Sequence, residues 1–136
     1  MTTATSKQAK EKTSSDTKKI GTFLGEVFAF TNSLKLYHWH VTGKASYAEH
    51  IALDQAITSL KGALDRITET SYALDGDIEI VIPQTSVPSN IVKHATGFFE
   101  YVDSSYKLFS ESFSQSILDD IQEAVQQLLF RLERLS

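Results

Sequence analysis

Apolar residues recur every three or four positions through four separate stretches of this chain, which is the spacing of a helix with one buried face. Gly43 separates the first two stretches and suits the left-handed conformation that often follows a helix. Ser46 and Glu49 then have the spacing of a capping box, which favours a helix start. The pattern predicts an all-α protein whose helices span about 19–41, 46–72, 89–112 and 116–136.

The connection between the second and third predicted helices is long. Its sequence at 78–86, IEIVIPQTS, alternates apolar and polar residues like a short strand, but the chain offers no second strand to pair with it. We therefore expect a packed, extended crossover. Four helices with one long middle crossover and two short connections have the topology of a ferritin-like four-helix bundle.

Composition limits the class of protein and of metal site. With 136 residues, 41% of them hydrophobic, the chain is long enough for one domain with its own core. The absence of cysteine excludes disulfides and thiolate ligands, so nitrogen and oxygen must hold any metal. No apolar run approaches the roughly 20 residues of a membrane span, and no signal peptide is evident. We expect a cytoplasmic protein without membrane association.

The N-terminal segment differs from the rest of the chain. Ser, Thr, Lys and Ala dominate it without any apolar period, so we expect 1–18 to be a disordered basic tail and 19–136 to form the bundle. Two interpretations stay open for the tail, a solvated leader and a flexible arm that binds the phosphate backbone of DNA. The lysines of such an arm are Lys7, Lys10, Lys12, Lys18 and Lys19.

Histidines and acids lie at metal-ligand spacing around the first bend. His38 precedes the bend and His50 follows it, so an antiparallel hairpin sets both at similar depth. Along the second predicted helix, His50 and Asp54 are four residues apart, as are Asp65 and Glu69, so each pair projects to one side. Imidazole and carboxylate together suit iron, zinc or manganese. Each residue also has an ordinary interpretation as a solvated or hydrogen-bonded side chain.

Distance decides how such a site is built. Asp54 and Asp65 are separated by close to three helical turns, so both pairs share nearly one stripe, yet they lie roughly 16 Å apart. Ligands of one metal lie about 2 Å from it, so one chain cannot close the site. Two chains that pack these helices antiparallel about a two-fold axis would form two identical intersubunit sites. The chain also lacks the Glu-x-x-His motif with which di-iron bundles build a site inside one chain.

Residues 20–72 resemble the Dps family of mini-ferritins. The family motif of His-Trp, followed by His, an acid, Asp and Glu, falls without a gap on His38, Trp39, His50, Asp54, Asp65 and Glu69. The resemblance implies a ferroxidase centre for two ferrous ions at each two-fold interface, with the first three ligands from one chain and Asp65 and Glu69 from its partner. Trp39 is then an oxidisable neighbour that intercepts radicals, whereas core packing is its alternative role.

The resemblance also implies an activity and an assembly. Dps proteins oxidise iron with hydrogen peroxide or dioxygen, store ferric mineral in a twelve-subunit homo-oligomer and often bind DNA. This chain departs from the family in KASY after Gly43 and in its short length. Its compact length, the stretch SYAEHIAL and the ending LDDIQEAVQQLLFRLERL look similar to small proteins of phages and large DNA viruses. The alternative function is therefore a DNA-binding or virion structural protein with a vestigial metal site. His40 and His94 are expected to be structural or exposed.

Overall fold

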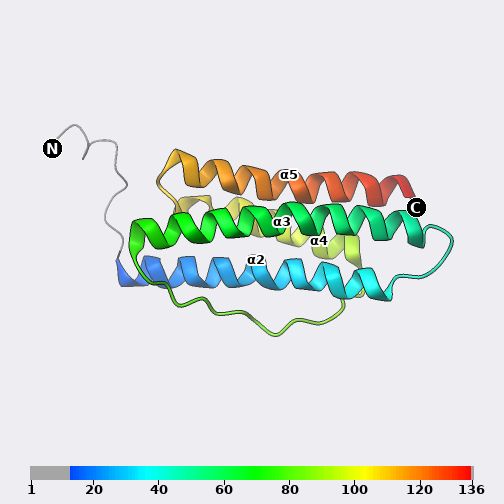
Figure 1. Cartoon of the computed structure of the whole chain (residues 1–136), viewed down its shortest axis with the longest axis horizontal. Coiled ribbons are helices and arrows are strands. Elements are labelled where there is room, and N and C mark those ends of the chain that lie inside the picture. The colour runs from blue at the N-terminus through cyan, green and yellow to red at the C-terminus, as the bar shows by residue number, and fades with distance from the viewer. Residues whose placement is uncertain (1–12, 136) are drawn as a thin grey trace.

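The computed structural model describes residues 13–135, which fold into a bundle of four α-helices (Figure 1). The predicted all-α four-helix bundle is confirmed, and the described residues contain no strand. None of the described helices is long and apolar enough to cross a membrane. The helices are α2 (Ser14–His40), α3 (Ser46–Asp75), α4 (Ile91–Ser105) and α5 (Ser112–Leu135), with a short 3₁₀ helix, η1 (Tyr106–Leu108), between the last two.

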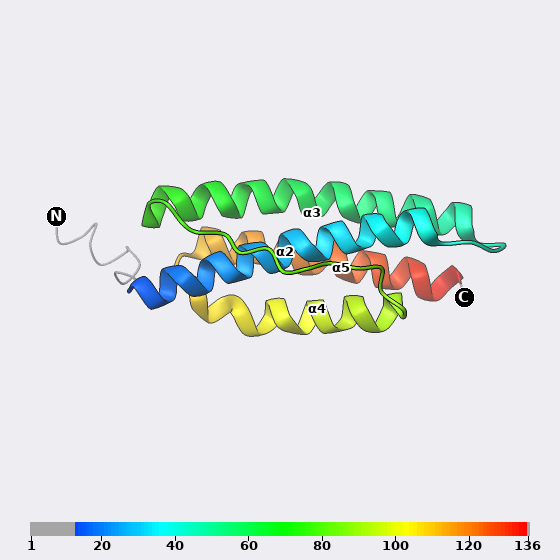
Figure 2. The same cartoon turned by 90° about the horizontal axis from the view of Figure 1, so that it is seen from below.

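The helices form two antiparallel hairpins, α2 with α3 and α4 with α5 (Figures 1 and 2). Helix α3 packs against both α2 and α5, and α4 packs against α5. Their apolar stripes meet along the middle of the bundle, where fully buried side chains each contribute roughly 1.5–3 kcal/mol to folding. The largest of them include Phe23, Leu24, Leu53, Leu60, Leu118 and Leu128.

Helix α2 begins earlier than the apolar pattern indicates. Thr13 and Asp16 form a capping box, in which the backbone N–H of Asp16 donates to Thr13 Oγ1 at 3.1 Å and that of Thr13 donates to Asp16 Oδ2 at 3.3 Å. Residues 14–18, expected in the disordered tail, are therefore helical. Polar composition concealed this start because the cap, not an apolar stripe, stabilises the first turn.

The five lysines of the predicted DNA-binding arm fall on both sides of residue 13, where the described structure begins. Lys18 and Lys19 are exposed on the early turns of α2, where they are part of the bundle. Lys7, Lys10 and Lys12 lie outside the described residues.

The turn between α2 and α3 is built differently from the expected capping box. Gly43 has a φ of +107°, which favours glycine, as the sequence predicts. The N-cap of α3 is Ala45, however, and no side chain caps the helix start. The prediction of a capping box at Ser46 and Glu49 is wrong. Ser46 is already inside the first helical turn, so its hydroxyl is not at the capping position.

The end of α4 and the start of α5 also differ from the positions that the sequence predicts. Helix α4 ends at Ser105, where η1 follows, although the pattern predicts a helix to residue 112. Helix α5 begins at Ser112, earlier than the predicted Ser116. Phe109, buried between them, lies in an extended conformation, so its place in the apolar pattern reflects core packing rather than a continuing helix.

Residues 77–90, here called the strap, connect α3 to α4 and run back along α2 as extended chain (Figures 1 and 2). Two glycines of α2 allow this close approach, because a Cβ at Gly25 would lie 1.7 Å from the carbonyl oxygen of Val81, and one at Gly21 would lie 2.0 Å from that of Glu79. The backbone N–H of Val81 donates to the carbonyl of Gly21 at 3.4 Å. The strap is thus packed directly on the backbone of α2.

Candidate metal centre

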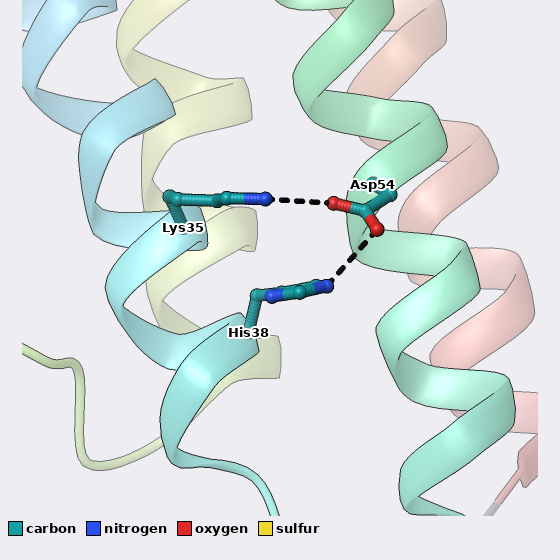
Figure 3. Close-up of polar contacts among 3 residues, drawn as sticks. All are labelled: Lys35, His38 and Asp54. Atoms are coloured by element: carbon teal, nitrogen blue, oxygen red, sulfur yellow. Dashed lines mark hydrogen bonds and ion pairs between the residues drawn. The ribbon is translucent and has the colours of Figure 1, made fainter.

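His38 and Asp54 meet across the α2–α3 hairpin (Figure 3). His38 lies on the last turn of α2, and the turn at Gly43 brings α3 back so that Asp54 faces it. His38 Nε2 lies 3.0 Å from Asp54 Oδ2, and Lys35 donates from Nζ to the other oxygen, Oδ1, at 3.1 Å. One carboxylate therefore contacts both an imidazole and an ammonium group.

The electrostatics of this contact keep Asp54 ionised. The hydrogen bond from Lys35 lowers the pKa of the Asp54 carboxyl, and the neighbouring His38 lowers it further, whereas desolvation acts in the opposite direction. The carboxylate is exposed to solvent. Asp54 is therefore an anion that already holds one cationic group, the Lys35 ammonium, at the position where a metal ligand is expected.

His50 of α3 lies against His38, and the residues His38, His50 and Asp54 are here called the His38 cluster. Its ring packs edge-on against that of His38, with ring centroids 4.3 Å apart and an interplanar angle of 81°. His38 Nδ1 is buried and has no hydrogen-bond partner within residues 13–135. The structure thus brings together His38, His50 and Asp54, the three residues that the sequence assigns to one half of a site.

The donor atoms fit a transition metal but do not complete a site. Two ligands about 2.1 Å from one metal and at right angles are roughly 3 Å apart, which matches the separation of His38 Nε2 and Asp54 Oδ2. An imidazole–carboxylate set suits iron, zinc or manganese. Within residues 13–135, however, no three His, Cys, Asp or Glu side chains form a group that could hold a metal ion. Further ligands would have to come from beyond these residues.

Asp65 and Glu69, the other predicted ligands, lie farther along α3. Both are exposed, and neither has a hydrogen bond or ion pair within the described part of the chain. With about 1.5 Å of rise per residue, Asp65 is roughly 16 Å along the helix from Asp54. The structure therefore does not bring this pair to the His38 cluster within one chain.

Trp39 is two-thirds exposed, at 67%, so its alternative role in core packing is wrong for the single chain. Its ring contacts Lys35, the residue that pairs with Asp54, with Lys35 Nζ 5.8 Å from the ring centroid. The next residue, His40, is exposed, as expected for a side chain that points away from His38. Trp39 therefore has a surface position next to the first predicted ligand.

His94 has a more specific environment than the sequence suggests. Its Nε2 lies 2.8 Å from Ser33 Oγ, and its ring centroid is 5.2 Å from that of Phe30. Burial lowers the pKa of the imidazole. Sequence reasoning missed this pair, and it missed the Lys35–Asp54 pair, because both join residues on different helices. The one available signal was that Ser33 lies on the apolar face of α2.

Comparison with known proteins gives a family without an assigned function. Residues 38–132, more than two thirds of the chain, match the family described as "Family of unknown function (DUF5856)". The matched range includes all five predicted metal ligands. No curated protein and no solved structure matches the chain. The chain therefore belongs to DUF5856, a family of unknown function.

Proposed function

We propose that this protein is a Dps-like ferroxidase in which two copies pair through the exposed face of α3 and bind ferrous iron between them. Each site would combine His38, His50 and Asp54 of one copy with Asp65 and Glu69 of the other. The observation that carries the proposal is the meeting of the first three residues at one end of α3, while the two remaining acids are exposed near its other end, without a hydrogen bond or ion pair to any residue from 13 to 135.

The sequence positions on α3 support a two-fold arrangement. Residues that meet across an antiparallel helix pair must be equidistant from the axis. Asp54 and Asp65 have their midpoint between residues 59 and 60, and His50 and Glu69 have the same midpoint. A single two-fold axis at this point would therefore place Asp65 of each copy opposite Asp54 of the other, and Glu69 opposite His50. The same arrangement would form the site twice.

The surface around this axis has the character of a contact face. Tyr47 is 77% exposed, Ile51 42% and Tyr72 38%, all on α3. Tyr47 and Tyr72 also share the midpoint of the proposed ligands, so the axis would place each tyrosine opposite the other. Near the axis, an added Cβ at Gly62 would meet no described residue within 4 Å beyond its own stretch of α3, so a neighbouring helix can approach closely. Burying exposed aromatic side chains favours association.

The chemistry of the proposed site follows from its ligand types. His38 and His50 supply neutral imidazole nitrogens, and three carboxylates supply negative charge that favours ferric over ferrous iron. We infer that Asp65 bridges two ions. Two ferrous ions each lose one electron to hydrogen peroxide, which takes up two protons and leaves as two water molecules; dioxygen is the other candidate oxidant. Trp39, exposed and next to His38 in the sequence, would be an oxidisable side chain that can intercept an escaping oxidant.

Storage of the ferric product belongs to the same proposal. A homo-oligomer built from such dimers would enclose the oxidised iron, as the resemblance to Dps implies, and a twelve-subunit shell is the form found in that family. The charge of the chain, −4 overall, is compatible with the attraction of ferrous ions. Sedimentation of the purified protein would give the number of subunits.

The test is ferrous oxidation by hydrogen peroxide in the wild type, in Asp65→Ala and in a matched control, Glu100→Ala. Glu100 is an exposed acid on α4, away from the proposed site. We expect Asp65→Ala to lose fast oxidation but to keep its helical circular dichroism, because the exposed carboxylate contributes little to the core. The control should oxidise iron like the wild type. Equal rates in all three proteins would refute the catalytic role.

A further inference from the structure

A cleft of about 610 Å³ opens between α2, the strap and the first turns of α4. Its size lies within the range of about 300–1,000 Å³ that is typical of small-molecule sites. Pro83 and Pro88 of the strap form part of its wall, and their rings stiffen the extended chain. No residue of α3 lines the cleft, so it is separate from the candidate metal centre.

Stacked aromatic rings form one wall of the cleft. Phe30 of α2 and Phe98 of α4 stack with centroids 3.9 Å apart and planes inclined by 5°. Tyr101 continues the wall, with its ring centroid 6.3 Å from that of Phe98. Phe30 and Phe98 are buried in the core, which fixes their orientation. The cleft therefore presents rigid aromatic surface to an occupant.

The hydrogen bonds of Ser33 determine what His94 offers to the cleft. The Ser33 hydroxyl donates to the carbonyl oxygen of Phe30 at 2.6 Å, so its oxygen accepts from His94 Nε2 at 2.8 Å. Because burial favours the neutral imidazole, the proton on Nε2 leaves Nδ1 as an acceptor. His94 thus contributes an acceptor held in place by a buried serine.

Glu26 gives the cleft a negative charge. Its side chain is half-buried on α2 and has no hydrogen bond or ion pair within residues 13–135. It lies close enough to Tyr101 for its charge to raise the pKa of that phenol, in addition to the larger effect of burial. A half-buried carboxylate without a counter-ion is costly unless a cation pairs with it.

We propose that this cleft binds a small organic cation, a protonated amine on an apolar body. The ammonium group pairs with the Glu26 carboxylate and donates to His94 Nδ1, while the body lies against the rings of Phe98 and Tyr101. Aromatic faces also attract cations directly. Lys93 stands exposed at the rim of the cleft, where it disfavours a doubly charged cation and favours a single ammonium group.

The test compares three probes of similar shape and different charge: 2-phenylethylamine, 2-phenylethanol and 3-phenylpropanoate. Their affinities are measured by titration of the metal-free protein, with backbone amide shifts in a ¹⁵N-labelled sample to locate binding. We expect the amine to bind about tenfold or more tightly than either analogue. Its binding should shift the amides near Ser33 and His94.

Two variants assign the charge preference to Glu26. Glu26→Gln keeps the shape of the side chain and should weaken amine binding about tenfold or more, with little effect on 2-phenylethanol. Glu100→Gln removes an equal charge from α4 outside the cleft and should bind the amine like the wild type. The proposal is overturned if the alcohol or the propanoate matches the amine, if Glu26→Gln keeps full affinity while folded, or if no probe shifts the cleft amides.

Discussion

The ammonium group of Lys35 lies 3.1 Å from Oδ1 of Asp54, on the carboxylate oxygen that does not contact His38 (Figure 3). The contact neutralises a carboxylate that the proposed metal centre needs as a ligand. A ferrous ion that binds Asp54 therefore competes with Lys35 for the same negative charge.

Removing this competitor should tighten metal binding. In Lys35→Met the apolar part of the side chain remains but the charge is lost, so we expect Mn²⁺ to bind about two- to fivefold more tightly, the scale of an exposed ion pair. Lys107→Met, in η1, is the control and should not change the affinity. Titration calorimetry at low salt measures the effect, because salt screens it. Unchanged or weaker binding in Lys35→Met would show that Lys35 does not compete.

Gly25→Ala should destabilise the bundle. The new Cβ would lie 1.7 Å from the carbonyl oxygen of Val81, so the strap must move off α2. We expect a loss of about 1–3 kcal/mol in the free energy of unfolding, measured with urea. Gly97→Ala, at a helical position where the added Cβ would meet no described residue within 4 Å beyond its own stretch of α4, should instead gain about 0.5–1 kcal/mol. The same sign in both variants would contradict this account of the strap.

The half-buried His94 should make stability depend on pH. Burial lowers the pKa of its imidazole in the native state, so below about pH 6.5 the unfolded chain binds more protons than the native protein. The stabilisation present above pH 6.5 is then lost as pH falls towards the native pKa. The slope stays below about 1.4 kcal/mol per pH unit, because the ring is only half-buried.

Urea unfolding of the wild type and of His94→Gln at about pH 7.5 and about pH 5.5 measures this contribution. The wild type should lose more stability between the two conditions than the variant does, because other titrating groups are common to both. An equal loss would mean that His94 is protonated as readily in the native protein as in the unfolded chain.

Removal of residues 1–12 tests the alternative function in DNA binding. The cut leaves the Thr13–Asp16 capping box in place, whereas a cut at residue 18 would also remove the first turn of α2. Because Lys7, Lys10 and Lys12 are lost, we expect weaker, less salt-dependent retention of DNA in a gel-shift assay. Ferrous oxidation should not change. DNA retention equal to that of the full chain would assign no binding role to these lysines.

The local features of this structure could be predicted well from the sequence, because each depends on residues close together in the chain. The four helices follow from apolar spacing, and the positive φ at Gly43 follows from the lack of a side chain there. The nearness of His38 and His50 follows from the length of the hairpin turn. A bend of known length thus fixes which turns of two helices face each other.

Features that depend on contacts between helices could not be predicted. The spacing of α2 gives no sign that Lys35 reaches Asp54, or that Ser33 reaches His94 across the bundle. The ends of the helices could not be predicted either, because a capping box at Thr13 and an extended residue at Phe109 do not change the spacing of apolar residues. Packing between elements selects these partners and ends from many that the sequence allows.

Complementation between variants tests whether two copies complete one metal site. A His38→Ala chain lacks a ligand from one half of the site and a Glu69→Ala chain lacks one from the other, so each homodimer should be slow in ferrous oxidation. When the two are unfolded together and refolded, each mixed dimer contains one site with all five ligands and one site that lacks both. The mixture should regain about a quarter of wild-type activity, since about half of randomly formed dimers are mixed and one of the two sites in each is complete. A mixture no faster than either parent, although mixed dimers are present by mass spectrometry, would contradict a site shared between copies.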